Sequence, residues 1–113
     1  MVSGSEAQLG AISEALWADR PGDFLANGMA GTAHDARQPI LLSQTMEAAN
    51  GARMVMFADG TWREGADRFD RAMLLFDDGG IEGARACWRM LGESEAVERR
   101  FWKQEDGRWR EGP

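Results

Sequence analysis

Three continuous apolar runs of strand length constrain the fold of this chain more than any other feature. They span residues 39–43, 53–58 and 72–76, and none shows the regular alternation of apolar and polar residues typical of a strand with one solvated face. Continuous apolar strands are buried on both faces, as in parallel sheets covered by helices. The sequence therefore predicts a single α/β domain over residues 1–113, with a mostly parallel sheet.

A helix is predicted before the first run. Ser5 and Gln8 have the spacing of a capping box, in which each side chain binds the backbone amide of the other residue. Leu9, Ile12 and Leu16 then fall on one helical face. Residues 20–22 are expected to end the helix, and residues 23–38 are expected to form a loop.

A second helix is predicted after the third run. Asp77 and Asp78 precede it and are expected to cap its first turn. Its apolar stripe contains four residues: Ile81, Ala84, Trp88 and Leu91. Residues 97–104 are expected to form a last strand, and residues 106–110 either close a hairpin with it or form an exposed tail.

Composition and charge exclude several classes of protein. No apolar stretch approaches the ~20 residues of a membrane span, and no leader-like segment opens the chain, so we expect a cytoplasmic protein. The net charge is −6, with a balance of −7 over residues 1–84 and +1 over residues 85–113. An acidic body repels phosphate, so DNA contact is expected to be indirect or weak. The single cysteine, Cys87, excludes an internal disulfide and is expected to fill space on a helix.

The sequence contains no complete catalytic, cofactor or metal site. His34 is the only histidine and Lys103 the only lysine, so a phosphate-binding loop with its lysine is excluded. Asp59 and Asp77 follow apolar runs, where carboxylates serve metals in doubly wound folds, but they also lie in turn sequences. We therefore expect no enzyme activity, no cofactor and no metal.

Several short segments, taken in order and at their spacing, resemble the chi subunit of bacterial DNA polymerase III. They are EALW (14–17), FLANGMAG (24–31), RQPILL (37–42), NGA (50–52), DG (59–60), RFDR (68–71), ARACWR (84–89), FWKQ (101–104) and RW (108–109). The resemblance covers nearly the whole chain. It implies a Rossmann-like three-layer fold without a nucleotide site. Compared with the family, the chain is expected to be truncated at its N-terminus. The first strand and helix would be missing, Met1 and Val2 would end the second strand, and an apolar edge would be exposed.

The resemblance also implies a function. Family members are non-catalytic accessory subunits of the DNA polymerase III holoenzyme, a nucleotidyltransferase complex of DNA replication. They pair with the psi subunit of the clamp loader and bind the acidic C-terminal tail of the single-stranded-DNA-binding protein. That tail ends in a free carboxylate on an aromatic residue.

Residues for both contacts follow from the resemblance and from residue chemistry. Arg85, Trp88 and Arg89 match the family's tail-binding helix. The two arginines are one turn apart, so both guanidinium groups can face one acidic peptide, whereas the alternative is a solvated arginine face beside a core tryptophan. The candidates for the psi contact are large apolar residues around the first helix and its loop: Trp17, Phe24, Leu25 and Met29. A helicase is a further candidate partner for the same surface.

Two other classes stay open at this point. One is a fragment of a magnesium-dependent nucleotide-binding hydrolase that uses Asp59 and Asp77. The other is a receiver-like signalling domain, which needs a lysine at a later strand end, and Lys103 is the only lysine.

Overall fold

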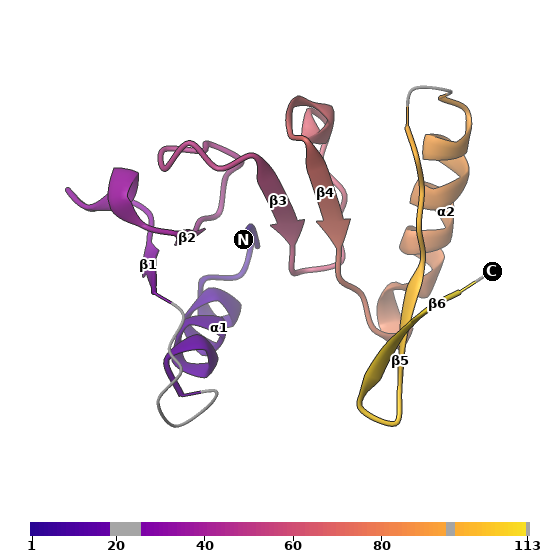
Figure 1. Ribbon diagram of the computed structural model, residues 1–113, viewed down its shortest axis with the longest axis horizontal. Helices are drawn as coiled ribbons and strands as arrows, with labels where there is room; N and C mark the ends of the chain where they lie inside the picture. The colour runs from indigo at the N-terminus through magenta and orange to yellow at the C-terminus, as the bar shows by residue number, and fades with distance from the viewer. Residues whose placement is uncertain (19–25, 95–96, 113) are drawn as a thin grey trace.

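The computed structural model describes residues 1–18, 26–94 and 97–112. This part of the chain contains two α-helices, three single-turn 3₁₀ helices and six short strands (Figure 1). The helices are α1 (Glu6–Ala18) and α2 (Ile81–Gly92), and the 3₁₀ turns are η1 (Asp35–Arg37), η2 (Ala66–Arg68) and η3 (Asp78–Gly80). The strands are β1 (Asn27–Met29), β2 (Ile40–Leu42), β3 (Met54–Phe57), β4 (Arg71–Leu74), β5 (Trp102–Glu105) and β6 (Arg108–Glu111).

The three apolar runs form β2, β3 and β4, and the two strand pairs that contain them are parallel, as predicted. β1 pairs with β2, with Gly28 opposite Leu41, and β3 pairs with β4, with Val55 opposite Ala72. The prediction that residues 23–38 are all loop is wrong, because β1 lies within them. Its sequence, Asn-Gly-Met, has almost no intrinsic strand preference, so its pairing with β2 decides its conformation.

Residues 1–3 join the two parallel pairs. The Val2 amide donates to the Met56 carbonyl at 2.7 Å, and the Ala58 amide donates to the Val2 carbonyl at 2.9 Å. On the other side the Ser3 amide donates to the Ser43 carbonyl at 3.1 Å. Val2 thus makes parallel bridges to both flanks, and the order across the molecule is β1, β2, residues 1–3, β3, β4. Both edges of this segment are hydrogen bonded, so the exposed apolar edge expected beside it is not found there.

The main core is formed by the side chains of this central region. Val2, Val55, Phe57 and Ala66 are buried together, and the Trp62 ring packs edge-on against Phe57 with 5.4 Å between ring centroids. Burial of these side chains holds β3 and β4 against residues 1–3.

α1 is positioned by its first turn. The Gln8 amide donates to Ser5 Oγ at 3.1 Å, which confirms half of the predicted capping box. The other half is wrong, because the Gln8 side chain reaches the sheet instead. Its Nε2 donates to the Ala58 carbonyl at 2.8 Å, and its Oε1 accepts from the Ser3 hydroxyl. Leu9 is fully buried, as the predicted apolar face requires.

α2 begins without a side-chain cap. Gly80 is its N-cap residue and no side-chain hydrogen bond caps it, so the prediction that Asp77 and Asp78 cap the helix is wrong. The reason is local: residues 78–80 form the extra turn η3, so Asp77 and Asp78 come before the N-cap position of α2, which Gly80 occupies. Cys87 is buried on the inner face of α2, as predicted.

β5 and β6 form an antiparallel hairpin, as one of the two predicted alternatives requires. The two turn residues, Asp106 and Gly107, have φ angles of 52° and 75°, the left-handed conformation that a tight two-residue hairpin turn needs. The strand begins later than predicted, at Trp102. Figure 1 shows the chain that leads into β5 running beside α2.

Candidate functional site

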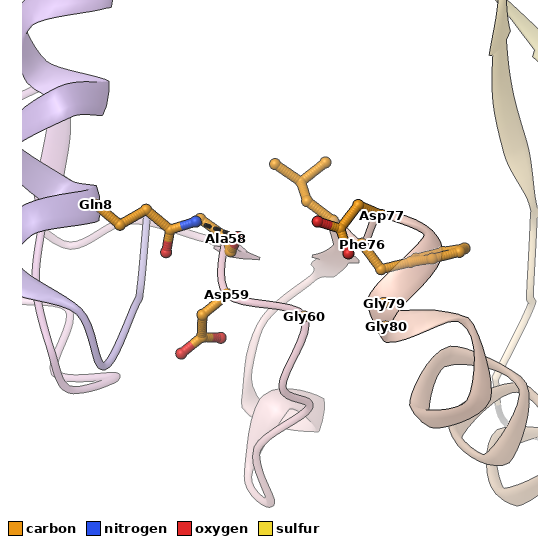
Figure 2. Close-up of a pocket in the computed structure, with 9 residues that line it drawn as sticks. Gln8, Ala58, Asp59, Gly60, Phe76, Asp77, Gly79 and Gly80 are labelled. Atoms are coloured by element: carbon orange, nitrogen blue, oxygen red, sulfur yellow. Dashed lines mark hydrogen bonds between the residues drawn. The ribbon is translucent and has the colours of Figure 1, made fainter.

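The ends of β3 and β4 border an open pocket of about 450 Å³ (Figure 2). Its wall is formed by the first turn of α1, by the residues after both strands and by η3: Gln8, Ala58, Asp59, Gly60, Leu75, Phe76, Asp77, Gly79 and Gly80. Many α/β folds bind ligands in pockets at strand ends. The magnesium-dependent hydrolase alternative would therefore need its catalytic carboxylates in this pocket.

In this pocket the Asp59 carboxylate is hydrogen bonded to other residues of the chain. Its carboxylate accepts from both terminal nitrogens of Arg63, at 2.7 and 3.1 Å, and from the Gly4 and Thr61 amides, at 2.8 and 3.2 Å. The bonds to Arg63 hold the pKa of Asp59 far below its usual range, and the two amides act in the same direction against partial burial. Figure 2 shows its carboxylate directed away from Asp77. The turn interpretation of Asp59 is confirmed.

The other chemistry-bearing residues are also separate. Within the described residues, no three His, Cys, Asp or Glu side chains gather as a metal site would require. His34 is exposed beside η1. Burial raises the pKa of the Cys87 thiol, so the thiolate that acts as a nucleophile is disfavoured.

The exposed face of α2 carries the two arginines predicted to bind a peptide. Arg85 and Arg89 are both exposed and one helical turn apart, so their side chains leave the same side of the helix. The Arg85 guanidinium makes one ion pair, to Glu82 at 3.7 Å between side chains that are 66% and 91% exposed. Such exposed pairs are weak, so this one offers little competition to an incoming carboxylate.

Trp88 is half-buried between this face and the chain leading into β5. The guanidinium of Arg99 lies over the Trp88 ring, with Cζ 4.4 Å from the ring centroid. Its Nη1 also donates to the Trp88 carbonyl at 2.6 Å. One face of the indole is therefore covered by a cation, which adds Arg99 to the charged side chains around α2.

Sequence reasoning missed Arg99. It lies in a segment predicted as strand, eleven residues after Trp88, and no helical or strand spacing connects the two. A second contact explains how the segment reaches α2. Phe101 stacks on Phe76, just before η3, with 6.4 Å between the ring centroids. Phe101 thus fixes the chain two residues beyond Arg99.

The residues predicted to contact psi are only partly described. Trp17, near the end of α1, is 52% exposed, and Met29, at the end of β1, is half-buried. α1 and β1 are in contact, so the two residues belong to neighbouring elements. Phe24 and Leu25 lie outside the described residues.

A comparison with protein families identifies the chain. The sequence model of the family described as DNA polymerase III chi subunit, HolC, matches residues 1–106. The chain belongs to this family. The resemblance inferred from the short segments is thus confirmed, and family membership makes the chain an accessory subunit of DNA polymerase III, a replication enzyme.

Other comparisons add no relatives to this chi family member. Neither the curated proteins nor the solved structures contain a match to the chain. No helix in the described ranges is both long enough and apolar enough to cross a membrane.

Proposed function

We propose that this chi family member is a non-catalytic, cytoplasmic adaptor of the replicase. One surface pairs with the psi subunit of the clamp loader, and the other binds the acidic C-terminal tail of the single-stranded-DNA-binding protein. The chain works as one domain of the Rossmann-like three-layer type and needs no cofactor. DNA contact is indirect or weak, because six excess negative charges oppose a phosphate backbone.

The observation that carries the proposal is the pair of exposed guanidinium groups on α2 next to Trp88. Arginine offers planar, bidentate donors to carboxylates, and two arginines one turn apart follow an extended acidic peptide better than one. The basic balance of residues 85–113 places the favourable potential at the same end of an otherwise acidic chain. An acidic peptide is therefore repelled less by this end of the chain than by residues 1–84.

Titration with an acidic peptide that ends in a free phenylalanine tests the tail site. We expect Arg85→Ala and Arg89→Ala each to weaken binding by about tenfold, since a hydrogen bond to a charged group contributes roughly 1.5–3 kcal/mol and exposure reduces this value. The affinity of the unchanged chain should fall steeply with added salt, because exposed charges are screened.

The matched control is Arg37→Ala, which removes an exposed arginine from η1, far along the sequence from α2. It should leave the affinity unchanged. Equal affinities for Arg85→Ala, Arg89→Ala and the unchanged chain would contradict the tail site.

The psi surface rests on the side chains around the end of α1. A tryptophan that is half exposed near a helix end is typical of the aromatic anchors that dominate protein interfaces. Trp17 and Met29, together with Phe24 and Leu25, provide the apolar area for psi, and a helicase that used the same area would compete with psi.

A further inference from the structure

The position of Arg99 adds a third cation to the surface of α2, and it differs from the other two. Arg85 and Arg89 project from the helix, whereas Arg99 comes from the chain before β5 and lies against the Trp88 ring. Stacking on an indole and a 2.6 Å bond to the Trp88 carbonyl restrict the guanidinium to one place. A restricted, planar cation loses little freedom when it binds a carboxylate.

Gly92 makes this position possible. A Cβ atom added at Gly92 would lie 2.5 Å from Arg99 Nη1 and 2.8 Å from its Cζ, so a side chain there would displace the guanidinium. Gly92 is the last residue of α2, and its φ is not in the left-handed region, so alanine is compatible with its backbone. The absence of a side chain there lets the Arg99 guanidinium lie along the helix end.

Arg100, the neighbour of Arg99, is engaged elsewhere. Its Nε and Nη2 donate to one carboxylate oxygen of Glu98 at 3.0 and 2.8 Å. The two adjacent arginines therefore carry the same charge in different settings. Arg99 faces Trp88 and the exposed side of α2, and Arg100 is paired with an acidic side chain.

We infer that Arg99 is the residue that binds the terminal carboxylate of the acidic peptide, and this inference rests on the function proposed above. Only the last residue of such a peptide carries an aromatic ring and a free α-carboxylate together. Only Trp88 and Arg99, among the described residues of this surface, present an indole and a stacked guanidinium together. Arg85 and Arg89 then bind the acidic side chains that precede the terminus.

Two forms of one peptide test this assignment. The probe is a short acidic peptide ending in phenylalanine, prepared as the free acid and as the C-terminal amide, and the full chain is titrated with each. The unchanged chain should prefer the free acid by about tenfold, the value of one charge-assisted hydrogen bond. Arg99→Ala should reduce this preference to about one while hardly changing the affinity for the amide.

Two matched pairs of variants separate this role from a general effect of charge. Arg100→Ala removes the same charge from the next residue and should keep the preference. Gly92→Ala keeps every charge but displaces Arg99, so it should lose the preference. Gly83→Ala makes the same change at an exposed position of α2 where an added Cβ meets nothing within 4 Å, and it should keep the preference.

Each outcome decides between the two ideas. If Arg99→Ala or Gly92→Ala retains the full preference for the free acid, the assignment of Arg99 is overturned while peptide binding at α2 stands. If Arg99→Ala weakens both peptides equally, Arg99 acts as a general charge and the assignment is again overturned. If the unchanged chain binds neither peptide, the proposed function fails and this inference fails with it.

Discussion

At the scale of residues, the most tightly bound charge in the described chain is Asp59. Four donors surround its carboxylate, and they come from Arg63, Gly4 and Thr61. The Gly4 amide precedes α1 and the other donors follow β3, so one carboxylate ties two segments that are 55 positions apart. A partly buried carboxylate that accepts four hydrogen bonds in this way stabilises the fold.

Asp59→Asn should therefore destabilise the chain in a pH-dependent way. Because the pKa of Asp59 is lower in the folded chain than in the unfolded one, its contribution is present above the unfolded pKa of about 4 and is lost as the pH falls below it. We expect a loss of about 1–2 kcal/mol in the free energy of unfolding by urea at pH 7. The loss should shrink as the pH approaches 3.

Asp70→Asn is the matched control for this experiment. Asp70 also pairs with an arginine, Arg53, at 2.7 Å, but the two side chains are 61% and 81% exposed. Exposed pairs contribute little, so the control should change the stability by no more than about 0.5 kcal/mol. Equal losses in the two variants, or a loss for Asp59→Asn that does not depend on pH, would contradict the account of Asp59.

The sequence predicts the turn role of Asp59 but not its partners. Asp-Gly after an apolar run is a local signal, and the bond to the Thr61 amide is the local structure that this signal predicts. The bond to Gly4 depends on how α1 sits on the sheet, which no local pattern reveals. The partner of the Gln8 side chain was equally unpredictable. Its spacing from Ser5 fits a capping box, but its Nε2 donates to the Ala58 carbonyl, fifty positions away in the sequence.

At the scale of elements, residues 1–3 decide whether the two parallel pairs form one sheet. Val2 is 4% exposed and exchanges backbone hydrogen bonds with β3 on one side, while its neighbours Met1 and Ser3 bond to Ser43 on the other. A segment this short has no helical or strand pattern of its own. Its extended conformation is set by hydrogen bonds to the strand pairs on either side, and the same bonds hold the two pairs together.

Val2→Ala should accordingly cost about 2 kcal/mol in the free energy of unfolding, because it removes two buried methyl groups from the main core. Val97→Ala makes the same change where the side chain is 37% exposed, and it should cost less than about 0.5 kcal/mol. Urea denaturation followed by circular dichroism measures both. Similar costs at the two positions would show that residues 1–3 do not support the core.

Element by element, the apolar runs were sufficient to predict β2, β3 and β4 and the parallel direction of their pairing, but not the partner of β2. β1 could not be predicted, because a short Asn-Gly-Met segment becomes a strand only beside β2. The hairpin was predictable from Asp106-Gly107, whose preference for positive φ is intrinsic. On α2 the spacing of Arg85 and Arg89 gave the exposed face, whereas Arg99 reaches Trp88 through tertiary packing alone.

At the scale of the whole molecule, the two proposed surfaces are separate. Figure 1 shows α1 and α2 on opposite sides of the β3–β4 pair. Trp17 belongs to α1 and the tail site to α2, and the core of Val2, Val55 and Phe57 lies between them. If both proposals hold, we expect a partner bound at one surface to leave the other accessible.

Variants at Trp17 and at Phe24 test this independence. Trp17→Ala and Phe24→Ala should each abolish co-purification with psi, since truncated interface anchors commonly cost 2 kcal/mol or more. Affinity for the acidic peptide and the circular dichroism spectrum should stay unchanged. Arg89→Ala should give the reverse pattern. Loss of both partners in one folded variant, or retention of psi by Trp17→Ala and Phe24→Ala, would contradict two separate surfaces.

The place of residues 1–3 in the sheet has a consequence for how the fold assembles. This segment precedes in sequence every strand that it unites, so ribosomes make the central segment before either flank. Its hydrogen bonds on the β3 side cannot be complete until Ala58 has been made, because the Ala58 amide donates to the Val2 carbonyl. Contacts between such distant residues form slowly. We expect residues 1–3 to take their place in the sheet only after the first half of the chain, up to Ala58, has left the ribosome.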